Sequence, residues 1–293
     1  MIKKLVIFGG SGFVGGNLAR IAQQKGWQVV IADNRPVPEA EYRLVDITDK
    51  DSVEKVIGEI QPTAAVNVAA IADIDLAERD QELAYRVNVN GARNIAESCA
   101  RRGTRYVFFS SDAVFAGEKN SYKEEDSLGP VNYYGRTKMD AEISVLHACP
   151  AAAIIRISLV LGYPIQSGNS FFANLQSKLQ EGQVILTPMF EIRTPVDVYT
   201  LSECVLELCE NEYSGILHIG ATDSISRYDL TRELAQRMGS DAELIKPLPA
   251  SEVKPGRAAR HKNGIVDVSK AQKLLKTRLL TTSESIQRAF DQQ

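Results

Sequence analysis

The chain is poor in the residues that build metal and disulfide sites. It contains only three histidines among 293 residues, and these are far apart in the sequence. Its four cysteines, Cys99, Cys149, Cys204 and Cys209, form no Cys-x-x-Cys pair. This spacing indicates neither a zinc site nor a Ser/His/Asp triad. We therefore expect no metal, and cysteines that stay reduced.

Basic runs and long apolar segments are also lacking. The 34 Lys and Arg residues are balanced by 37 Asp and Glu residues, for a net charge of -3. This balance argues against a nucleic-acid surface. No apolar run reaches the roughly 20 residues that span a bilayer, and the N-terminus shows no leader pattern. The expectation is a cytoplasmic protein that binds neither nucleic acid nor membrane.

Short apolar runs alternate with helical patterns over the first half of the chain. Strands are predicted at 4–8, 28–32, 42–45, 64–68, 105–110 and 152–157, and helices at 13–25, 50–60, 82–101 and 131–148. Such alternation predicts an α/β fold with a doubly wound parallel sheet, of the Rossmann type.

The predicted organisation has two parts. An NAD(P)-binding Rossmann domain is expected over residues 1–162, and 195–222 returns to it through a helix at 199–210 and a strand at 216–219. A smaller C-terminal α/β lobe for the substrate is expected over 163–194 and 223–293, where glycine and proline interrupt the pattern.

A glycine-rich turn, residues 9–15 (GGSGFVG), follows the first predicted strand. In a dinucleotide site Gly9 permits the tight turn, Gly12 lets the backbone approach a pyrophosphate, and Gly15 lets the helix pack closely. The helix N-terminus then binds the phosphates. A plain strand-to-helix turn remains the alternative. Contacts to a dinucleotide are expected from Gly9, Ser11, Gly12, Phe13, Val14 and Gly15.

The second predicted strand leads to Asp33, near the roughly 20-residue offset of an acid that binds the adenine ribose 2′-hydroxyl. Asp33 therefore favours NAD, although a simple turn would also suit it. Arg35 could instead pair with a 2′-phosphate, so NADP remains possible. Further cofactor contacts are expected from Asn34, Asp46, Ile47, Ala69, Ala70 and Ile71.

A possible proton donor stands on the predicted helix 131–148. Tyr134 and Lys138 are four residues apart and share one helix face. A tyrosine has a pKa of about 10, and a neighbouring cation favours its phenolate. Ser111, which follows Ser110 at the end of the fifth strand, could orient a carbonyl oxygen for protonation. A surface Tyr–Lys pair and a serine turn would look the same in isolation.

Together these motifs resemble an extended short-chain dehydrogenase/reductase, most closely the dTDP-dehydrorhamnose reductase-like (RmlD-like) sugar-nucleotide reductases. The resemblance is carried by residues 67–78 (NVAAIADIDLAE), 83–88 (LAYRVN), 110–117 (SSDAVFAG) and 130–135 (PVNYYG). It implies Tyr134 as acid in reduction and base in oxidation, with Ser111 orienting the carbonyl. Lys138 would bind the nicotinamide ribose and lower the tyrosine pKa. Asn88 would hold either the local backbone or a water relay in place. Asn88 and Ser110 would also contact the cofactor.

The implied activity is NAD(P)-dependent reduction or oxidation of a carbonyl on a sugar nucleotide. Sugar-nucleotide 4,6-dehydratases usually carry Asp-Glu after the fifth strand, whereas here Ala113 follows Asp112, which disfavours dehydration. An epimerase and a non-catalytic NAD(P)-binding regulatory subunit remain alternatives. The resemblance also implies a homodimer formed through the helices at 82–101 and 131–148.

Departures from the family pattern fall on the substrate side. Leu159 stands where rhamnose-pathway reductases usually have tryptophan, which removes a large surface from the sugar pocket. Asn17 replaces an acidic residue that some members use for a metal. We expect a different nucleotide sugar or a related carbonyl compound as substrate. Arg193, Arg257 and Arg260 are either diphosphate ligands or surface residues. The substrate-side candidates are Asp112, Ala113, Leu159, Asn169, Arg193 and Arg260.

Overall fold

The computed structural model describes residues 3–37, 40–165, 168–249 and 257–292. Its centre is a seven-stranded sheet with the strand order β11-β6-β5-β4-β1-β2-β3, and every neighbouring pair is parallel. The strands are β1 (Lys4–Phe8), β2 (Gln28–Asp33), β3 (Tyr42–Leu44), β4 (Ala64–Asn67), β5 (Arg105–Ser111), β6 (Ala153–Ile157) and β11 (Gly215–Ile219). The predicted doubly wound parallel fold is confirmed.

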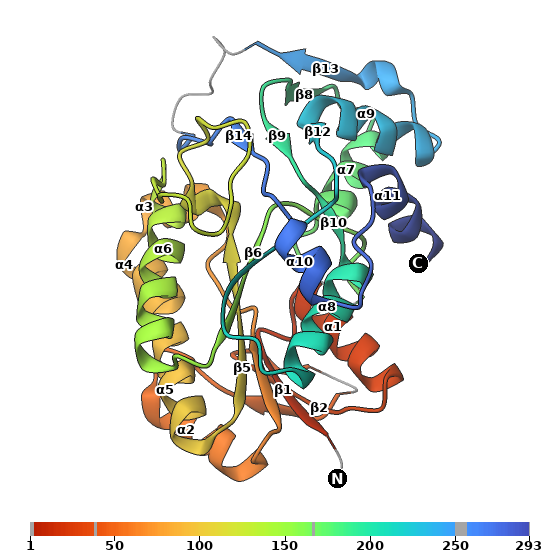
Figure 1. The fold of residues 1–293 in the computed structure, drawn as a ribbon. Helices are drawn as coiled ribbons and strands as arrows, with labels where there is room; N and C mark the ends of the chain where they lie inside the picture. The colour runs from red at the N-terminus through yellow and green to blue at the C-terminus, as the bar shows by residue number, and fades with distance from the viewer. Residues whose placement is uncertain (1–2, 38–39, 166–167, 250–256, 293) are drawn as a thin grey trace.

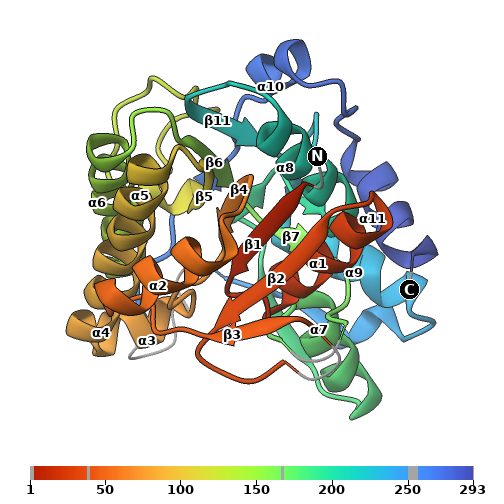
Figure 2. The same ribbon diagram turned by 90° about the horizontal axis from the view of Figure 1, so that it is seen from below.

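Helices cover both faces of this sheet (Figures 1 and 2). On one face lie α1 (Phe13–Gln24) and α8 (Val198–Glu210), and on the other lie α2 (Lys50–Ile60), α5 (Ala92–Arg102) and α6 (Tyr133–Ala148). The inner strands are therefore buried on both faces instead of alternating, and in β1 Leu5 to Phe8 are fully buried. Two hydrophobic clusters result, one on each face.

The segment expected as one helix at 82–101 has three parts. It contains α4 (Gln81–Tyr85), a π-helix (Arg86–Gly91) and then α5. A wider turn of this kind redirects side chains and is frequent near functional sites. Here it contains Asn88, and Gly91 lies so close to Ile47 that a Cβ would approach its Cδ1 to 2.6 Å. A periodic apolar pattern alone does not distinguish such a turn from a regular helix.

The C-terminal part adds small sheets and a third hydrophobic cluster. The paired strands are β7 (Val160–Leu161) with β10 (Val196–Asp197), β8 (Ile185–Pro188) with β13 (Ile245–Leu248), and β9 (Ile192–Arg193) with β12 (Ile225–Ser226) and β14 (Asn263–Gly264). The remaining α-helices are α3 (Ile74–Arg79), α7 (Phe171–Gln180), α9 (Arg227–Arg237), α10 (Ser269–Leu274) and α11 (Thr282–Asp291), and 3-10 turns lie at Asp112–Val114 and Ala242–Leu244. The predicted domain boundaries stay a prediction.

None of the helices in the described ranges is long and apolar enough to cross a membrane.

A buried ion pair ties β6 to α6. Arg156 donates from Nη2 to Glu142 Oε2 at 2.7 Å and from Nε to Oε1 at 2.8 Å. The two side chains are 1% and 3% exposed. Arg156 also donates to the carbonyl of Glu124 and lies over the Phe115 ring, with its Cζ 5.0 Å from the centroid. The pair therefore has the partners that burial of two charges requires.

Removing one member of this pair should destabilise the fold strongly. Arg156→Met leaves Glu142 buried without its cation, and we expect a loss of roughly 3–5 kcal/mol in the free energy of unfolding, measured by urea denaturation. Arg156→Met with Glu142→Leu removes both charges and should recover most of that loss. A single variant as stable as the wild type would contradict this account.

Candidate active site and cofactor-binding turn

Most of the candidate site residues follow the carboxyl ends of parallel strands. Gly9 follows β1, Asp33 ends β2, Asn67 ends β4 and Ser111 ends β5. Because parallel strands end at one edge of a sheet, these residues gather at the edge where open α/β sheets usually bind their ligands.

The glycine turn has the shape that a pyrophosphate needs. Gly9 has a φ of +85°, and a Cβ there would approach the Ala69 backbone N to 2.6 Å. A Cβ at Gly15 would lie 2.4 Å from the Gly9 carbonyl oxygen. Gly12 caps α1 without a side-chain hydrogen bond, so the first N–H groups of this 12-residue helix remain for an anion. The turn therefore fits a dinucleotide.

Asp33 and Arg35 both face the turn. Asp33 is 7% exposed and accepts from Ser11 N at 3.0 Å through Oδ2, and from Arg35 N at 3.3 Å through Oδ1. Arg35 donates from Nη2 to Ser11 Oγ at 3.0 Å. A carboxylate suited to a ribose hydroxyl and a guanidinium suited to a 2′-phosphate thus lie side by side.

The other predicted cofactor contacts have different surroundings. Asn34 is exposed, and Asp46 is exposed and accepts hydrogen bonds from Thr48. Ile47 is buried against Gly91. Ser110 donates to Glu142 Oε1 at 2.5 Å, so its hydroxyl lies inside the core. The cofactor contact predicted for Ser110 stays a prediction.

Asn88 supports the loop after β4. Its Oδ1 accepts from Ile71 N at 2.8 Å, and its Nδ2 donates to Ile71 O at 3.2 Å and to Thr137 Oγ1 at 2.9 Å. Asn67 likewise accepts from Ala69 N. The segment Ala69–Ile71 is thereby held against α6, which agrees with the backbone role expected for Asn88.

Tyr134 and Ser111 meet at the end of β5. The Ser111 hydroxyl is near enough to the Tyr134 phenol to affect its pKa. The Asn132 side chain caps α6 by accepting from Gly135 N at 2.8 Å, which fixes where the helix begins and how Tyr134 enters it. Burial raises the pKa of Tyr134 to about 12, the Ser111 hydroxyl opposes this rise, and the Asp112 charge adds to it.

Lys138 lies one helical turn after Tyr134 on α6. The net shift of the Tyr134 pKa is upward because burial dominates it, and the lowering expected from Lys138 stays a prediction. Lys138 is 3% exposed, and its Nζ lies 4.6 Å from the Phe108 ring centroid. Burial lowers the pKa of Lys138 to about 8, against the opposing charge of Glu142.

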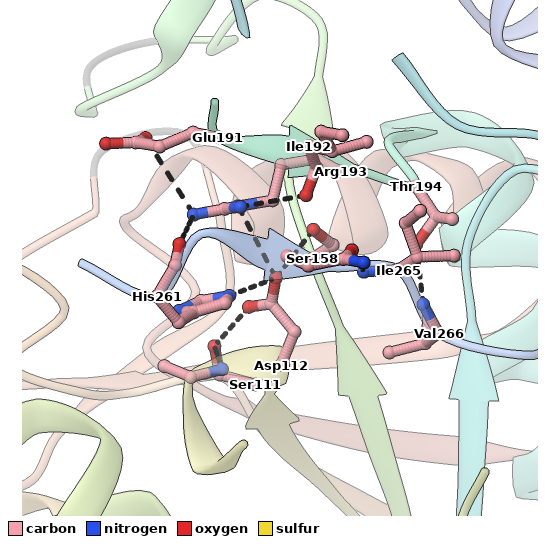
Figure 3. A network of polar contacts seen from close by, with 12 residues as sticks. Ser111, Asp112, Ser158, Glu191, Ile192, Arg193, Thr194, His261, Ile265 and Val266 are labelled. Carbon is pink, nitrogen blue, oxygen red and sulfur yellow. Dashed lines mark hydrogen bonds and ion pairs between the residues drawn. The ribbon is translucent and has the colours of Figure 1, made fainter. Parts of the chain in front are cut away.

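Asp112 is the centre of a buried polar network (Figure 3). Its Oδ1 accepts from Ser111 Oγ at 3.1 Å, and its Oδ2 accepts from Ser158 Oγ at 2.7 Å. His261 Nε2 lies 3.2 Å and Arg193 Nε 3.6 Å from the same Oδ2. Burial raises the pKa of Asp112, but His261, Arg193 and Ser158 outweigh it and hold the pKa at about 2.

Two arginines that were candidates for substrate contacts form hydrogen bonds within the protein. Arg193 donates from Nη1 to the carbonyls of Ile192 and Lys262 and from Nη2 to that of His261. Arg260 makes a bidentate pair with Asp75, at 3.1 and 3.0 Å. These guanidinium groups hold the segment 258–262 in place, so the structure does not support their assignment as substrate ligands.

The remaining substrate-side candidates are scattered. Ala113 is 2% exposed, and a Cβ at Gly135 would lie 2.1 Å from its carbonyl oxygen, so it packs against α6. Leu159 is half-buried and packs on the third hydrophobic cluster. Asn169 is exposed and accepts a hydrogen bond from Asn174.

An arginine cluster that sequence patterns did not reveal lies beside Asp112. Arg227 extends over Phe171, with its Cζ 4.1 Å from the ring centroid. Burial lowers the pKa of Arg227 to about 10; Glu191 opposes this, and Arg193 and Arg257 add to it. Glu191 is 7% exposed, with carboxylate oxygens 3.8 Å from Nη2 of Arg193 and of Arg257. Four residues around Asp112 belong to no sequence motif, and only their proximity in the fold identifies them. They are Ser158, Glu191, Arg227 and His261.

Within the described parts of the chain, no group of three or more His, Cys, Asp or Glu side chains could hold a metal ion.

Comparison with known proteins assigns the chain to a family. Residues 3–293 match the RmlD substrate binding domain, and the chain belongs to this family. It is 31% identical to dTDP-4-dehydrorhamnose reductase of Mycolicibacterium smegmatis over 250 residues, which is 84% of this chain and 73% of that protein. The resemblance inferred from the motifs is confirmed.

Two further relatives differ in their described roles. A dTDP-4-dehydrorhamnose reductase from Bacillus anthracis, solved in complex with NADP, superposes with a TM-score of 0.90 at 26% identity over 100% of both chains. Methionine adenosyltransferase 2 subunit beta of Pongo abelii is 26% identical over 93% of this chain and 82% of that protein.

Two adjacent glycines of α1 provide a test of the cofactor turn. A Cβ at Gly15 would meet the Gly9 carbonyl at 2.4 Å, whereas at Gly16 it would lie 3.5 Å from the Gly10 carbonyl, an ordinary contact. Gly15→Ala should cost about 1–3 kcal/mol of stability and weaken NADH and NADPH binding at least tenfold, measured by fluorescence titration. Gly16→Ala should bind normally and gain up to about 1 kcal/mol. Equal binding by both variants would contradict the assigned role of the turn.

Proposed function

We propose that this protein is a nicotinamide-dependent oxidoreductase of the extended short-chain dehydrogenase/reductase type that reduces a carbonyl group on a nucleotide sugar. The observation that carries the proposal is the pair formed by Tyr134, in the first turn of α6, and Ser111, at the end of β5. It lies at the sheet edge that also bears the glycine turn. Membership of a family that contains dTDP-4-dehydrorhamnose reductases supports it.

The bound dinucleotide supplies hydride to the substrate carbonyl carbon. Tyr134 donates its proton to the carbonyl oxygen, and a phenol with a pKa of about 12 is protonated at neutral pH, as an acid must be. Ser111 donates a hydrogen bond to the same oxygen. Lys138 holds the nicotinamide ribose, and Asn88 keeps the loop at Ile71 against α6.

The two side chains beside Ser11 support use of both dinucleotides. The Asp33 carboxylate suits the 2′-hydroxyl of NAD(H), which we propose is favoured. Arg35 reaches the same turn and gives NADP(H) a cation for its 2′-phosphate. Titration with NADH and NADPH, with Arg35→Ala weakening only the latter, tests this choice.

The arginine cluster supports a diphosphate group in the substrate. Arg193 is already occupied by backbone carbonyls, so Arg227 and Arg257 are the guanidinium groups that we assign to the anion. In the described residues, Arg227 has an aromatic face beneath it but no hydrogen-bond acceptor. Glu191 balances part of the positive charge of Arg193 and Arg257.

A regulatory subunit is the second candidate, because one relative is a subunit of methionine adenosyltransferase. The cofactor turn would serve that role as well, so the turn does not separate the two functions.

An epimerase would use the same Ser111 and Tyr134 but release no reduced product.

The family homodimer stays a prediction, which light scattering tests. Two exposed apolar side chains, Tyr85 at 41% and Ile143 at 62% exposure, lie on the helices concerned.

Loss of the Tyr134 hydroxyl should stop turnover without preventing binding. With NADH or NADPH and a panel of keto nucleotide sugars, Tyr134→Phe should lower kcat by about 10²–10⁴-fold because the proton donor is lost. Dinucleotide affinity should change little. Tyr133→Phe removes the neighbouring phenol and serves as the control. If the wild type binds both dinucleotides but reduces no substrate, the enzyme assignment fails and the regulatory role is favoured.

Substitution of Arg227 should act on substrate binding. Arg227→Gln removes a charged donor to the diphosphate, and we expect the KM for the nucleotide sugar to rise roughly 10–100-fold with little change in kcat. Arg232→Gln, on the same helix but near Glu243, is the matched control. An unchanged KM in the Arg227 variant would place the diphosphate elsewhere.

A further inference from the structure

We propose that His261 is a positioning residue. Its hydrogen bond to the Asp112 carboxylate weakens the bond from Ser111 to that carboxylate, so that the Ser111 hydroxyl can donate to the substrate carbonyl instead. The inference rests on the proposed reductase function and assigns a role to a side chain outside the Ser111, Tyr134 and Lys138 set. His261 and Asp112 are both buried, at 5% and 4% exposure, and their Nε2 and Oδ2 atoms are 3.2 Å apart. An ionised carboxylate only accepts hydrogen bonds, so the imidazole Nε2 carries the hydrogen.

The argument begins with the single hydrogen of the Ser111 hydroxyl. Ser111 Oγ donates to Asp112 Oδ1 at 3.1 Å while it accepts from Ala113 N, also at 3.1 Å. A hydroxyl has one hydrogen to donate. Donation to a substrate carbonyl therefore requires Ser111 to leave Asp112, and the strength of that bond determines how much binding energy the exchange costs.

Other donors to Asp112 weaken the hydrogen bond that its carboxylate accepts from Ser111. Ser158 donates to Oδ2 at 2.7 Å, and His261 shares this oxygen. Arg193 Nε stands 3.6 Å away, and three other N–H groups of Arg193 donate to backbone carbonyls. Each donor disperses the negative charge of the carboxylate, so the bond from Ser111 becomes easier to exchange. Asp112 contacts the His261 ring, and Arg193 contacts Asp112 and the His261 backbone carbonyl.

The backbone around His261 is shaped to hold the imidazole at this position. A Cβ at Gly264 would lie 2.4 Å from Asp112 Oδ2 and 2.6 Å from His261 Nε2. A Cβ at Gly117 would lie 2.7 Å from His261 Cβ. His261 Nδ1 is buried and has no hydrogen-bond partner among the described residues. A buried unpaired nitrogen is costly to stability, so its retention favours a functional reason.

The same network also acts on Tyr134. The negative charge of Asp112 is one of the influences that raise the pKa of the phenol. A carboxylate that has lost the His261 hydrogen bond is less well compensated, so it holds Ser111 more firmly and makes Tyr134 a weaker acid. Both effects reduce the rate of proton donation, whereas the glycine turn follows another strand, β1, and should be unaffected.

Variants at His261 separate this role from simple packing. His261→Leu removes the donor, and we expect kcat to fall about tenfold with little change in the KM for the dinucleotide. His261→Gln keeps an amide donor and should stay within about threefold of the wild type. In an Asp112→Asn background, His261→Leu should cost less than it does alone, because the carboxylate charge is gone. Equal losses in the Leu and Gln variants, or additive losses in the double variant, would overturn the proposal.

A measurement without turnover keeps the two proposals distinguishable. We expect the imidazole ¹⁵N spectrum at pH 8, assigned with His261→Gln, to report a hydrogen on Nε2 in the wild type and a changed signal in Asp112→Asn. A hydrogen on Nδ1 alone would overturn the positioning role even in an active enzyme. Failure of the wild type to reduce any keto nucleotide sugar would instead reject the reductase function, whatever the spectrum.

Discussion

The candidate site is organised around one buried negative charge, the carboxylate of Asp112. It lies directly after β5, where the parallel sheet delivers Ser111, and it needs compensation because burial alone would neutralise it. Ser158, Arg193 and His261 supply that compensation from segments 46 to 149 positions away along the chain. The C-terminal segments are thereby joined to the end of the sheet, and the position of Ser111 depends on this junction.

Successive side chains at the end of β5 serve different parts of the molecule. Ser110 joins the buried pair of Glu142 and Arg156, and Ser111 joins Asp112 and Tyr134. The alternation of a strand makes this possible, since neighbouring side chains point to opposite sides. Helix α6 contributes Glu142 to the first group and Tyr134 to the second. The stability of the core and the geometry of the candidate site therefore depend on the same helix and strand.

The relatives show what the fold permits. Dehydrorhamnose reductases and a methionine adenosyltransferase subunit align with nearly all of this chain. A shared dinucleotide fold does not separate these roles, because function resides in the side chains at the sheet edge. Here Tyr134 lies beside Ser111, and the Arg227 guanidinium lies over the Phe171 ring. On these two features we base the proposal that the protein acts on a phosphorylated carbonyl compound.

Local patterns were sufficient for the parallel sheet, the glycine turn and the order of Ser111, Tyr134 and Lys138, because periodicity and short spacings act over a few residues. They misjudged the helix at 82–101, since a π-turn keeps the apolar pattern. They also left open whether Arg193 and Arg260 bind a diphosphate, and the structure shows both bonded to the protein. The Asp112 network, the Arg227 cluster and the pKa direction of Tyr134 were decided only by the tertiary structure. Burial and charge compensation arise between distant segments, and no local sequence pattern records them.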